Sequence, residues 1–332
     1  MAAGEISLLL DRLIIGFPGK ILLPPITAAA IKGELISVIG HNGVGKSTLL
    51  RTLVNAAIPL GGRILAGESD ILRMDRKVFA RTIGYISTES VSAPNMRVID
   101  LVALGRFSYT NWLGSLEKGD KEIIGESIAM VGLEQFEQRF LNELSDGEKQ
   151  RAMIARLLAQ DTEIMVLDEP TAFLDIRNRY EILHLLHDLS RLKQKTIIMS
   201  THDLQAAMSE SDKIWLLTEN GLTEGAPEDL VLSGAFDTMF SSPAIKFRKT
   251  DGNFFPVREE GGAVFISGGG LTGEWTSRAM RRLGYNVLDK PSGNCLQVSF
   301  DEPGQKWFVA KGEKRLSAST IYELTKLINS GS

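Results

Sequence analysis

The motif Gly40-His41-Asn42-Gly43-Val44-Gly45-Lys46-Ser47-Thr48 fits G-x-x-x-x-G-K-[ST], the pattern of a phosphate-binding loop. The apolar run over residues 35–39 predicts a buried strand before it, and residues 47–54 predict a helix after it. The glycines let backbone N–H groups turn toward an anion, and the helix N-terminus adds partial positive charge. We expect Lys46 to reach the β- and γ-phosphates of a nucleoside triphosphate and the Ser47 hydroxyl to ligate Mg²⁺. The flanking elements disfavour the alternative, a glycine turn that binds nothing.

Composition and length bound the possible functions. The chain has 332 residues, which suggests about two domains, and its 43% hydrophobic residues allow a sizeable core. The formal net charge of -4 gives no indication of nucleic-acid binding. The single cysteine, Cys295, excludes an internal disulfide and is typical of a reducing compartment. No signal peptide or membrane-spanning stretch is recognisable, so we expect a cytoplasmic protein that serves any membrane through a partner.

The segments around the loop suggest strands and helices in alternation. Residues 6–15 and 21–26 are expected to form strands joined by a turn at 16–19, which carries Phe17. That ring could stack on a base, although the spacing alone favours a small hydrophobic plug. We expect Gly61-Gly62 to turn the chain, residues 70–80 to form a helix and residues 82–86 a strand. A region richer in helix follows, over about residues 88–160.

Within that helical region lies Leu144-Ser145-Asp146-Gly147-Glu148-Lys149-Gln150-Arg151. Its Ser145-x-x-Glu148 spacing predicts a capping box that opens a helix over residues 148–159. An uncovered helix N-terminus beside Ser145 is also suited to binding an anion.

Ile164-Met165-Val166-Leu167-Asp168-Glu169 is an apolar strand that ends in two carboxylates. Behind a phosphate-binding loop, Asp168 is suited to holding Mg²⁺ and Glu169 to orienting or deprotonating an attacking water. A helix over residues 181–192 and a strand over 196–199 follow, and then Ser200-Thr201-His202-Asp203. A lone histidine such as His202 is more often structural. A strand over residues 213–217, a turn at Asn220-Gly221 and a helix over 227–233 complete a mostly parallel sheet covered on both faces.

Taken together, these motifs resemble the ATP-binding cassette (ABC) family of ATPases over residues 6–240. The family signature, Leu-Ser-Gly-Gly-Gln, corresponds to Leu144-Ser145-Asp146-Gly147-Glu148, and Ala172-Phe173-Leu174-Asp175 looks like the family's D-loop. His202 matches the switch histidine that contacts the γ-phosphate, and Phe17 matches the aromatic residue that stacks on adenine. The resemblance therefore reverses the local preference at both positions.

The resemblance implies a P-loop α/β cassette, with a mixed sheet core, an antiparallel β subdomain and a helical subdomain. Two cassettes pair head to tail as a homodimer, so Ser145 and Gly147 would serve the nucleotide of the partner. Lys46, Glu169 and His202 would be catalytic, Ser47 and Asp168 would hold Mg²⁺, and ATP would be the nucleotide. The expected nucleotide contacts are Phe17, Gly40, His41, Asn42, Gly43, Val44, Gly45, Lys46, Ser47, Thr48, Ser145 and Gly147.

The sequence departs from the family pattern at two motifs. Thr88, followed by Glu89, stands where the family has a glutamine that senses Mg²⁺, and Thr88 is too short to replace it. The signature has Asp146 for glycine and Glu148 for glutamine, and an added carboxylate near ATP should repel phosphate unless it points away. We therefore expect slower hydrolysis or a tighter dependence on a partner.

Leu104-Gly105-Arg106-Phe107 is similar to a segment of cassettes that drive import of iron-siderophores, haem or cobalamin. Tyr109, Trp112 and Leu113 suit a groove that receives a permease, although an ordinary amphipathic helix and loop is the alternative. The implied partners are integral-membrane permease subunits and, indirectly, an extracytoplasmic substrate-binding protein. The chain would then lie peripherally at the cytoplasmic face of the inner membrane.

Three other functions remain open. A separate ATPase chain can also serve an exporter. A soluble cassette acting in DNA repair or on ribosomes is disfavoured, because the chain has one phosphate loop and no long heptad run. A regulatory module with little turnover is mildly favoured by the departures at Thr88, Asp146 and Glu148, but Glu169 and His202 are both present.

The remaining residues are expected to form an extra piece beyond a cassette at 1–240. We predict a linker over residues 241–262, with a hairpin at Asp251-Gly252, and a small α+β domain over 263–332. Its expected elements are strands over 264–267, 296–300 and 307–310 and helices over 272–283 and 318–328. Gly268-Gly269-Gly270-Leu271-Thr272-Gly273 matches a dinucleotide-binding pattern, but a lone match in so short a domain is weak. A regulatory or dimer-contact role is favoured instead.

Overall fold

The computed structural model describes residues 5–88, 95–110, 115–239, 244–250, 252–257, 262–293, 295–302, 304–311 and 314–329. The chain divides into two compact units. The first consists of Met1–Ser241 with Phe247–Phe254, and the second of Ser242–Lys246 with Phe255–Ser332.

A six-stranded sheet forms the centre of the first unit. Its order is β12-β11-β5-β10-β9-β8, and all neighbours are parallel except β12, which pairs antiparallel with β11. Every residue of β5, β9 and β10 is buried, as their largely apolar sequences favour in a sheet covered on both faces. The strands are β5 Leu35–Gly40, β8 Ile83–Ile86, β9 Ile164–Leu167, β10 Thr196–Ser200, β11 Lys213–Thr218 and β12 Gly221–Gly225.

Different layers cover the two faces of this sheet. One face packs on α1 (Lys46–Leu53) and on an antiparallel sheet of order β4-β1-β6-β7, around a core that includes Leu10, Val38 and Leu50. The other face packs on α6 (Ile176–Lys193) and the helical region, around a core that includes Leu186 and Met199. The antiparallel strands are β1 Ile6–Ile14, β4 Ile26–Ile31, β6 Gly61–Ala66 and β7 Ser69–Asp70.

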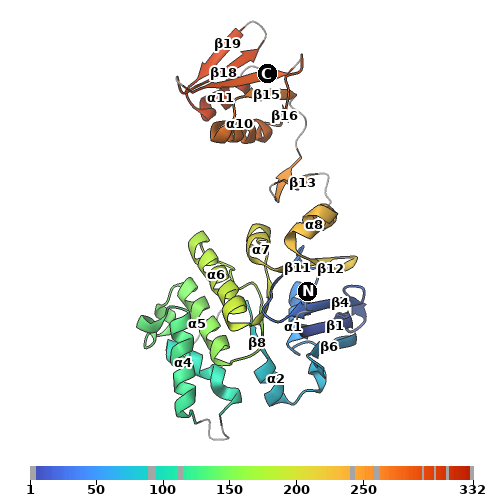
Figure 1. Ribbon diagram of the computed structural model, residues 1–332, viewed down its shortest axis with the longest axis vertical. Helices are drawn as coiled ribbons and strands as arrows, with labels where there is room; N and C mark the ends of the chain where they lie inside the picture. The colour runs from blue at the N-terminus through green and yellow to red at the C-terminus, as the bar shows by residue number, and fades with distance from the viewer. Residues whose placement is uncertain are drawn as a thin grey trace. The chain divides into compact units, whose positions relative to one another are not determined.

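The helical region lies on the opposite side of the unit from the antiparallel sheet, as α4 and α5 (green) and β1, β4 and β6 (blue) show in Figure 1. The described helices are α2 Arg76–Thr82, α3 Val98–Ala103, α4 Lys118–Met130 and α5 Asp146–Ala159, with short 3-10 turns at Ile71–Arg73, Leu104–Ser108, Glu134–Phe136 and Leu141–Glu143. This arrangement matches the predicted helix-rich region.

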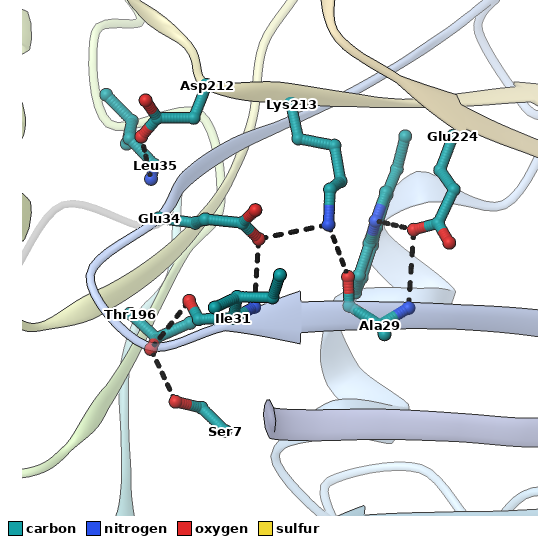
Figure 2. Close-up of polar contacts among 10 residues, drawn as sticks. Ser7, Ala29, Ile31, Glu34, Leu35, Thr196, Asp212, Lys213 and Glu224 are labelled. Atoms are coloured by element: carbon teal, nitrogen blue, oxygen red, sulfur yellow. Dashed lines mark hydrogen bonds and ion pairs between the residues drawn. The ribbon is translucent and has the colours of Figure 1, made fainter. Parts of the chain in front are cut away.

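Polar contacts connect the antiparallel sheet to the central sheet (Figure 2). The Glu34 carboxylate accepts hydrogen bonds from the Ile31 backbone N–H at 2.8 Å and from the Lys213 ammonium at 3.0 Å. Lys213 also donates to the Ala29 carbonyl oxygen at 2.9 Å, and the Ala29 N–H donates to Glu224 at 3.3 Å. These hydrogen bonds fix strand β4 against β11 and β12 and give the polar groups at this junction partners.

A hairpin follows the last helices of the first unit, α7 (Leu204–Glu210), α8 (Pro227–Ser233) and α9 (Ala235–Met239). It consists of β13 (Ile245–Arg248) and β14 (Asn253–Pro256), so the predicted hairpin is confirmed, although Asp251 lies outside the described residues.

The second unit contains a five-stranded sheet of order β16-β15-β17-β18-β19. Strand β15 is parallel to β16 and β17, whereas β17, β18 and β19 are antiparallel. Residues such as Val264, Val298 and Met280 form its core. The elements are β15 Ala263–Ser267, α10 Gly270–Arg282, β16 Asn286–Leu288, β17 Leu296–Asp301, β18 Lys306–Lys311, β19 Lys314–Ala318 and α11 Ile321–Asn329.

Some predicted boundaries were wrong. The strand expected over residues 21–26 is not continuous, because Pro24 and Pro25 lack the N–H groups that a ladder needs. The chain instead forms the short strand β3 (Lys20–Ile21) and then β4 from Ile26. Gly61 and Gly62 begin β6 rather than turning the chain. Residues 70–80 divide into β7, a 3-10 turn and α2, because the side chain of Asp75 caps α2 by accepting the N–H of Lys77.

Other elements went unpredicted or were misplaced. Helix α6 begins five residues before the expected position, since Asp175 caps it by accepting the N–H of Asn178. Strands β12, β16 and β19 and helices α7 and α9 had no predicted counterpart. Strand β19 occupies residues that precede the closing helix, which therefore starts at Ile321. Among the described residues, no helix is both long and apolar enough to cross a membrane.

Candidate functional site

The phosphate-binding motif forms the connection between β5 and α1. Gly43 and Gly45 have φ angles of 81° and 116°, a left-handed backbone that favours glycine. A Cβ on Gly40 would lie 2.7 Å from the carbonyl oxygen of Leu217, so the loop also needs a glycine there. This backbone leaves the N–H groups at the start of α1 without helical partners, as an anion site requires.

Lys46 is buried beneath the loop that it closes. Its ammonium donates to the carbonyl oxygen of Gly40 at 2.8 Å and to that of His41 at 3.3 Å. Burial lowers the pKa of Lys46 below its usual range, while the carboxylates of Glu169 and Asp168 act in the opposite direction. A cation held in this position can transfer its hydrogen bonds to incoming phosphate oxygens.

Asp168 lies directly after β9, beside the first turn of α1. The Ser47 hydroxyl donates to its Oδ1 at 3.4 Å, and the Ser200 hydroxyl donates to the same oxygen at 2.6 Å. Hard oxygen donors of this kind suit Mg²⁺, which binds through one or two protein groups together with waters and substrate phosphates. The predicted pair Ser47 and Asp168 is therefore brought together at the phosphate loop.

Glu169 adopts a left-handed backbone with a φ of 50°. Its N–H donates to the Ser200 hydroxyl at 2.9 Å, and its carboxylate contacts Nε2 of His202. Strands β9 and β10 are parallel neighbours, so their carboxyl ends place these two side chains at the same edge of the sheet.

Phe17 lies in a small hairpin of β2 (Gly16–Phe17) and β3 (Lys20–Ile21), and its side chain is 55% exposed. The hairpin flanks the phosphate loop, because a Cβ on Gly45 would lie 3.5 Å from side-chain atoms of Ile15 and Leu22. A buried plug would not be this exposed, so the geometry favours a ring that is available for stacking.

The signature segment caps α5. The Ser145 hydroxyl accepts the Glu148 N–H at 3.3 Å and donates to the Glu148 carboxylate at 2.7 Å, which confirms the predicted capping box. Burial acts to raise the pKa of Glu148, but the hydrogen bonds from Ser145 together with the charges of Arg139 and Arg151 lower that pKa. The Ser145 hydroxyl, which was expected to bind a nucleotide, therefore donates its hydrogen bond to the Glu148 carboxylate.

Gly147 packs tightly against α6, because a Cβ there would lie 2.9 Å from Cγ of Asn178. Asp146 is exposed, and its Oδ1 lies 3.4 Å from the ammonium of Lys149. In the described part of the chain, no hydrogen bond or ion pair joins Ser145 or Gly147 to the phosphate loop. These two residues are thus the predicted site residues that the fold of a single chain does not bring to the loop.

Thr88 lines a cavity of about 290 Å³ together with Asp146, Lys149 and Glu169. The side chain that departs from the family pattern therefore lines the same cavity as the expected catalytic carboxylate. Glu89, Trp112 and Leu113 lie outside the described residues.

Ser200 was not among the predicted site residues, although it contacts two of them. It lies at the end of β10, and its hydroxyl bridges the side chain of Asp168 and the backbone of Glu169. The available signal was a small polar residue at the end of a buried strand, which becomes informative only once that strand is known to pair with β9.

The comparisons with known proteins identify two regions. A family model described as ABC transporter matches residues 23–172, and one described as Iron ABC transporter C-terminal domain matches residues 261–329. An uncharacterized ABC transporter ATP-binding protein of Methanocaldococcus jannaschii is 32% identical over 283 residues, which cover 84% of this chain and 97% of that protein.

Relatives with assigned transport roles are similarly close. The petrobactin import ATP-binding protein FpuD of Bacillus anthracis is 37% identical over 66% of this chain and 81% of its own length. The ferric enterobactin transport ATP-binding protein FepC of Escherichia coli is 32% identical over 69% of this chain and 85% of its own length. A dimeric bacterial ABC transporter cassette of known structure has a TM-score of 0.58 and 25% identity, over 66% of this chain and 98% of that one.

Proposed function

The chain belongs to the ATP-binding subunits of ABC transporters, and from this premise we propose that it drives import of an iron-siderophore or related metal chelate. Members of this family hydrolyse ATP, and the chain is an ABC-type ATPase. Its fold is the P-loop ABC cassette with an added C-terminal domain. The observation that carries the proposed cargo class is the match of residues 261–329 to an iron transporter domain, alongside relatives named for petrobactin and ferric enterobactin.

The proposed hydrolysis site uses residues from three adjacent strand ends. The loop N–H groups and Lys46 hold the β- and γ-phosphates, and Phe17 stacks on the base. Glu169 orients the attacking water and accepts its proton, while His202 contacts the γ-phosphate. The contact between Glu169 and His202 supports this division of roles, because both side chains already face the same point.

Ser47 and Asp168 are the residues that would hold Mg²⁺. A bound Mg²⁺ would supply positive charge that neutralises the phosphate oxygens during transfer. The chain's own contribution is to fix the Asp168 carboxylate, through the hydrogen bond from Ser200 at 2.6 Å.

We also propose that two chains form a head-to-tail homodimer, in which Ser145 and Gly147 of one chain cover the nucleotide of the other. The exposed D-loop residue Phe173 supports a site that is completed by a second chain, as does the finding that, within the described ranges, Ser145 and Gly147 make no hydrogen bond or ion pair with the phosphate loop. To act, Ser145 must exchange its bond to Glu148 for one to the nucleotide, which supports slow basal turnover.

A surface beside α3 supports coupling to a permease. Arg106 is buried, donates to Asp120 at 2.9 Å and to the Ala159 carbonyl oxygen at 2.9 Å, and thus anchors this segment. Leu104 and Phe107 on either side are 51% and 76% exposed. Two apolar side chains held outward by a buried ion pair suit a protein contact. The Tyr109 ring instead contacts two arginines and has a structural role in this proposal: Cζ of Arg106 lies 3.7 Å and Cζ of Arg81 4.3 Å from its centroid.

The chain would work peripherally at the cytoplasmic face of the inner membrane, with an extracytoplasmic substrate-binding protein delivering cargo to the permease. Gentle purification from native membranes, followed by mass spectrometry, tests this proposal. A permease with many membrane spans should accompany the chain, and Phe107→Asp should release it. Recovery of soluble partners alone would contradict the importer.

A further inference from the structure

The hairpin β13–β14 packs against the helix that follows the His202 segment. Gln205, in the first turn of α7, donates through its side-chain amide to the carbonyl oxygen of Gly252 at 2.7 Å and to Oδ1 of Asn253 at 3.0 Å. Gly252 has a φ of 63°, and a Cβ there would lie 2.4 Å from the end of the Met208 side chain. The outer part of the hairpin, Phe247–Phe254, belongs to the same compact unit as α7.

Separate contacts hold this hairpin in place. The Phe247 ring lies 5.3 Å from the Phe236 ring and 5.0 Å from the Phe254 ring, centroid to centroid. Lys249 lies 3.0 Å from the carboxylate of Asp237 on α9. Phe236 is fully buried in the cluster formed by α7, α8 and the central sheet. Aromatic packing of this kind fixes the hairpin, and with it the Gly252 and Asn253 oxygens that accept hydrogen bonds from the Gln205 amide.

The hairpin lies close to the proposed hydrolysis site. A cavity of about 460 Å³ is lined by Glu169, Ala172 and His202 and also by Gly252, Asn253 and Phe254 of the hairpin. His202 stands between the end of β10 and the start of α7, in a segment without regular structure. Its backbone position therefore depends on where α7 begins.

The Asp203 N–H donates to the Thr201 hydroxyl at 3.0 Å across His202, and three further contacts hold the start of α7. Asp203 caps the helix by accepting the N–H of Ala206 at 3.0 Å, and Arg179 on α6 donates to Asp203 at 2.6 Å. The third contact is the pair of hydrogen bonds from Gln205 to the hairpin. Because a displacement of about 1 Å at a catalytic group can lower the rate up to about 100-fold, this third contact bears on turnover.

We propose that Gln205, Gly252 and Asn253 are positioning residues for His202. The linker before the C-terminal domain thereby takes part in hydrolysis instead of serving only as a covalent connection. This inference rests on the proposed contact of His202 with the γ-phosphate.

The test is steady-state ATP hydrolysis by the full chain carrying Gln205→Ala. We expect kcat to fall about 5-fold, with the KM for ATP within about 2-fold of wild type, because positioning affects the reacting geometry more than nucleotide binding. Ser209→Ala is the matched control, since Ser209 is exposed on the same helix and bonds to the Ala206 carbonyl oxygen within it. Asn253→Ala changes the hairpin side of the same contact and should also lower kcat. It provides the test if Gln205→Ala does not fold.

A double-mutant cycle with His202→Ala separates positioning from general loss of structure. If Gln205 acts through His202, adding Gln205→Ala to His202→Ala should lower kcat by less than about 1.5-fold further. Equal kcat values for Gln205→Ala, Asn253→Ala and Ser209→Ala would overturn the inference, as would losses that multiply in the double variant. Glu169→Gln reports on the proposed function separately, because turnover that survives this substitution would refute the hydrolysis site itself.

Discussion

Replacing Ser200 by alanine removes the hydroxyl that connects the two acidic residues at the end of β9. Ser200 is completely buried, and its oxygen donates to Asp168 at 2.6 Å while accepting the N–H of Glu169 at 2.9 Å. Asp168 is itself only 4% exposed, so water cannot easily replace the lost bond. The substitution therefore leaves a buried carboxylate and a backbone donor with fewer partners.

The magnitude follows from these two bonds. A hydrogen bond to a charged group contributes about 1.5–3 kcal/mol, and an unsatisfied buried N–H costs about 1–3 kcal/mol. We expect the free energy of unfolding to fall by about 3 kcal/mol after partial relaxation. Because Asp168 and Glu169 both lose their support, kcat should fall by about 10- to 100-fold, whereas nucleotide binding by the loop should change little.

Urea unfolding and ATPase kinetics measure the two effects together. Ser190→Ala is the matched control, because Ser190 is equally buried but donates to a carbonyl oxygen of its own helix, that of His187, at 2.8 Å. The control should lose about 1 kcal/mol of stability and keep its kcat. If Ser200→Ala kept the wild-type kcat, or if both variants lost stability and activity equally, the assigned role of Ser200 would be refuted.

Three further predictions concern other regions. Thr88→Gln should raise the kcat of the isolated protein about 3- to 10-fold by restoring a side chain long enough to reach the site, and an unchanged rate would contradict the account of slow turnover. Asp120→Asn should lower the free energy of unfolding by about 3 kcal/mol at pH 7, because it breaks the buried pair with Arg106. The pKa of Asp120 is lowered in the folded chain, mainly by the hydrogen bond from the backbone of Glu117. The difference in unfolding free energy between wild type and Asp120→Asn should therefore be largest above the unfolded pKa of about 3.9 and should shrink as the pH falls through the folded pKa. Urea unfolding at a series of pH values measures this difference. Phe107→Ala should leave basal ATP hydrolysis unchanged but weaken stimulation by the permease, as measured with reconstituted vesicles; equal stimulation would argue against the coupling surface.

Much of the fold could be predicted because the motifs constrain the backbone strongly. Only glycine suits the left-handed positions at Gly43 and Gly45, so the loop between β5 and α1 was recognisable from its spacing. Likewise, the Ser145–Glu148 spacing predicted the capping box that opens α5, although the helix begins at Asp146, two residues before the expected position. Both motifs lie within a few neighbouring residues, so they can be recognised without knowing how distant parts of the chain pair.

Other features depend on pairings that no local pattern contains. The role of Ser200 requires β10 to lie beside β9, and the role of Gln205 requires a hairpin almost fifty residues further along the chain to fold back on α7. The turn at Asn220-Gly221 was expected, but strand β12 after it was not, because only pairing with β11 makes that polar segment a strand.

The most direct test of the central claim compares wild type with Glu169→Gln for ATP hydrolysis and for ATP-dependent dimerisation by size-exclusion chromatography. The account predicts that the wild type turns over ATP slowly, and that Glu169→Gln loses at least about 100-fold in kcat while accumulating as an ATP-bound dimer. Lys46→Ala should abolish that dimer, because it removes the cation that holds the phosphates. If Glu169→Gln hydrolysed ATP at the wild-type rate and stayed monomeric with ATP, the assigned site and the paired-cassette mechanism would both be contradicted.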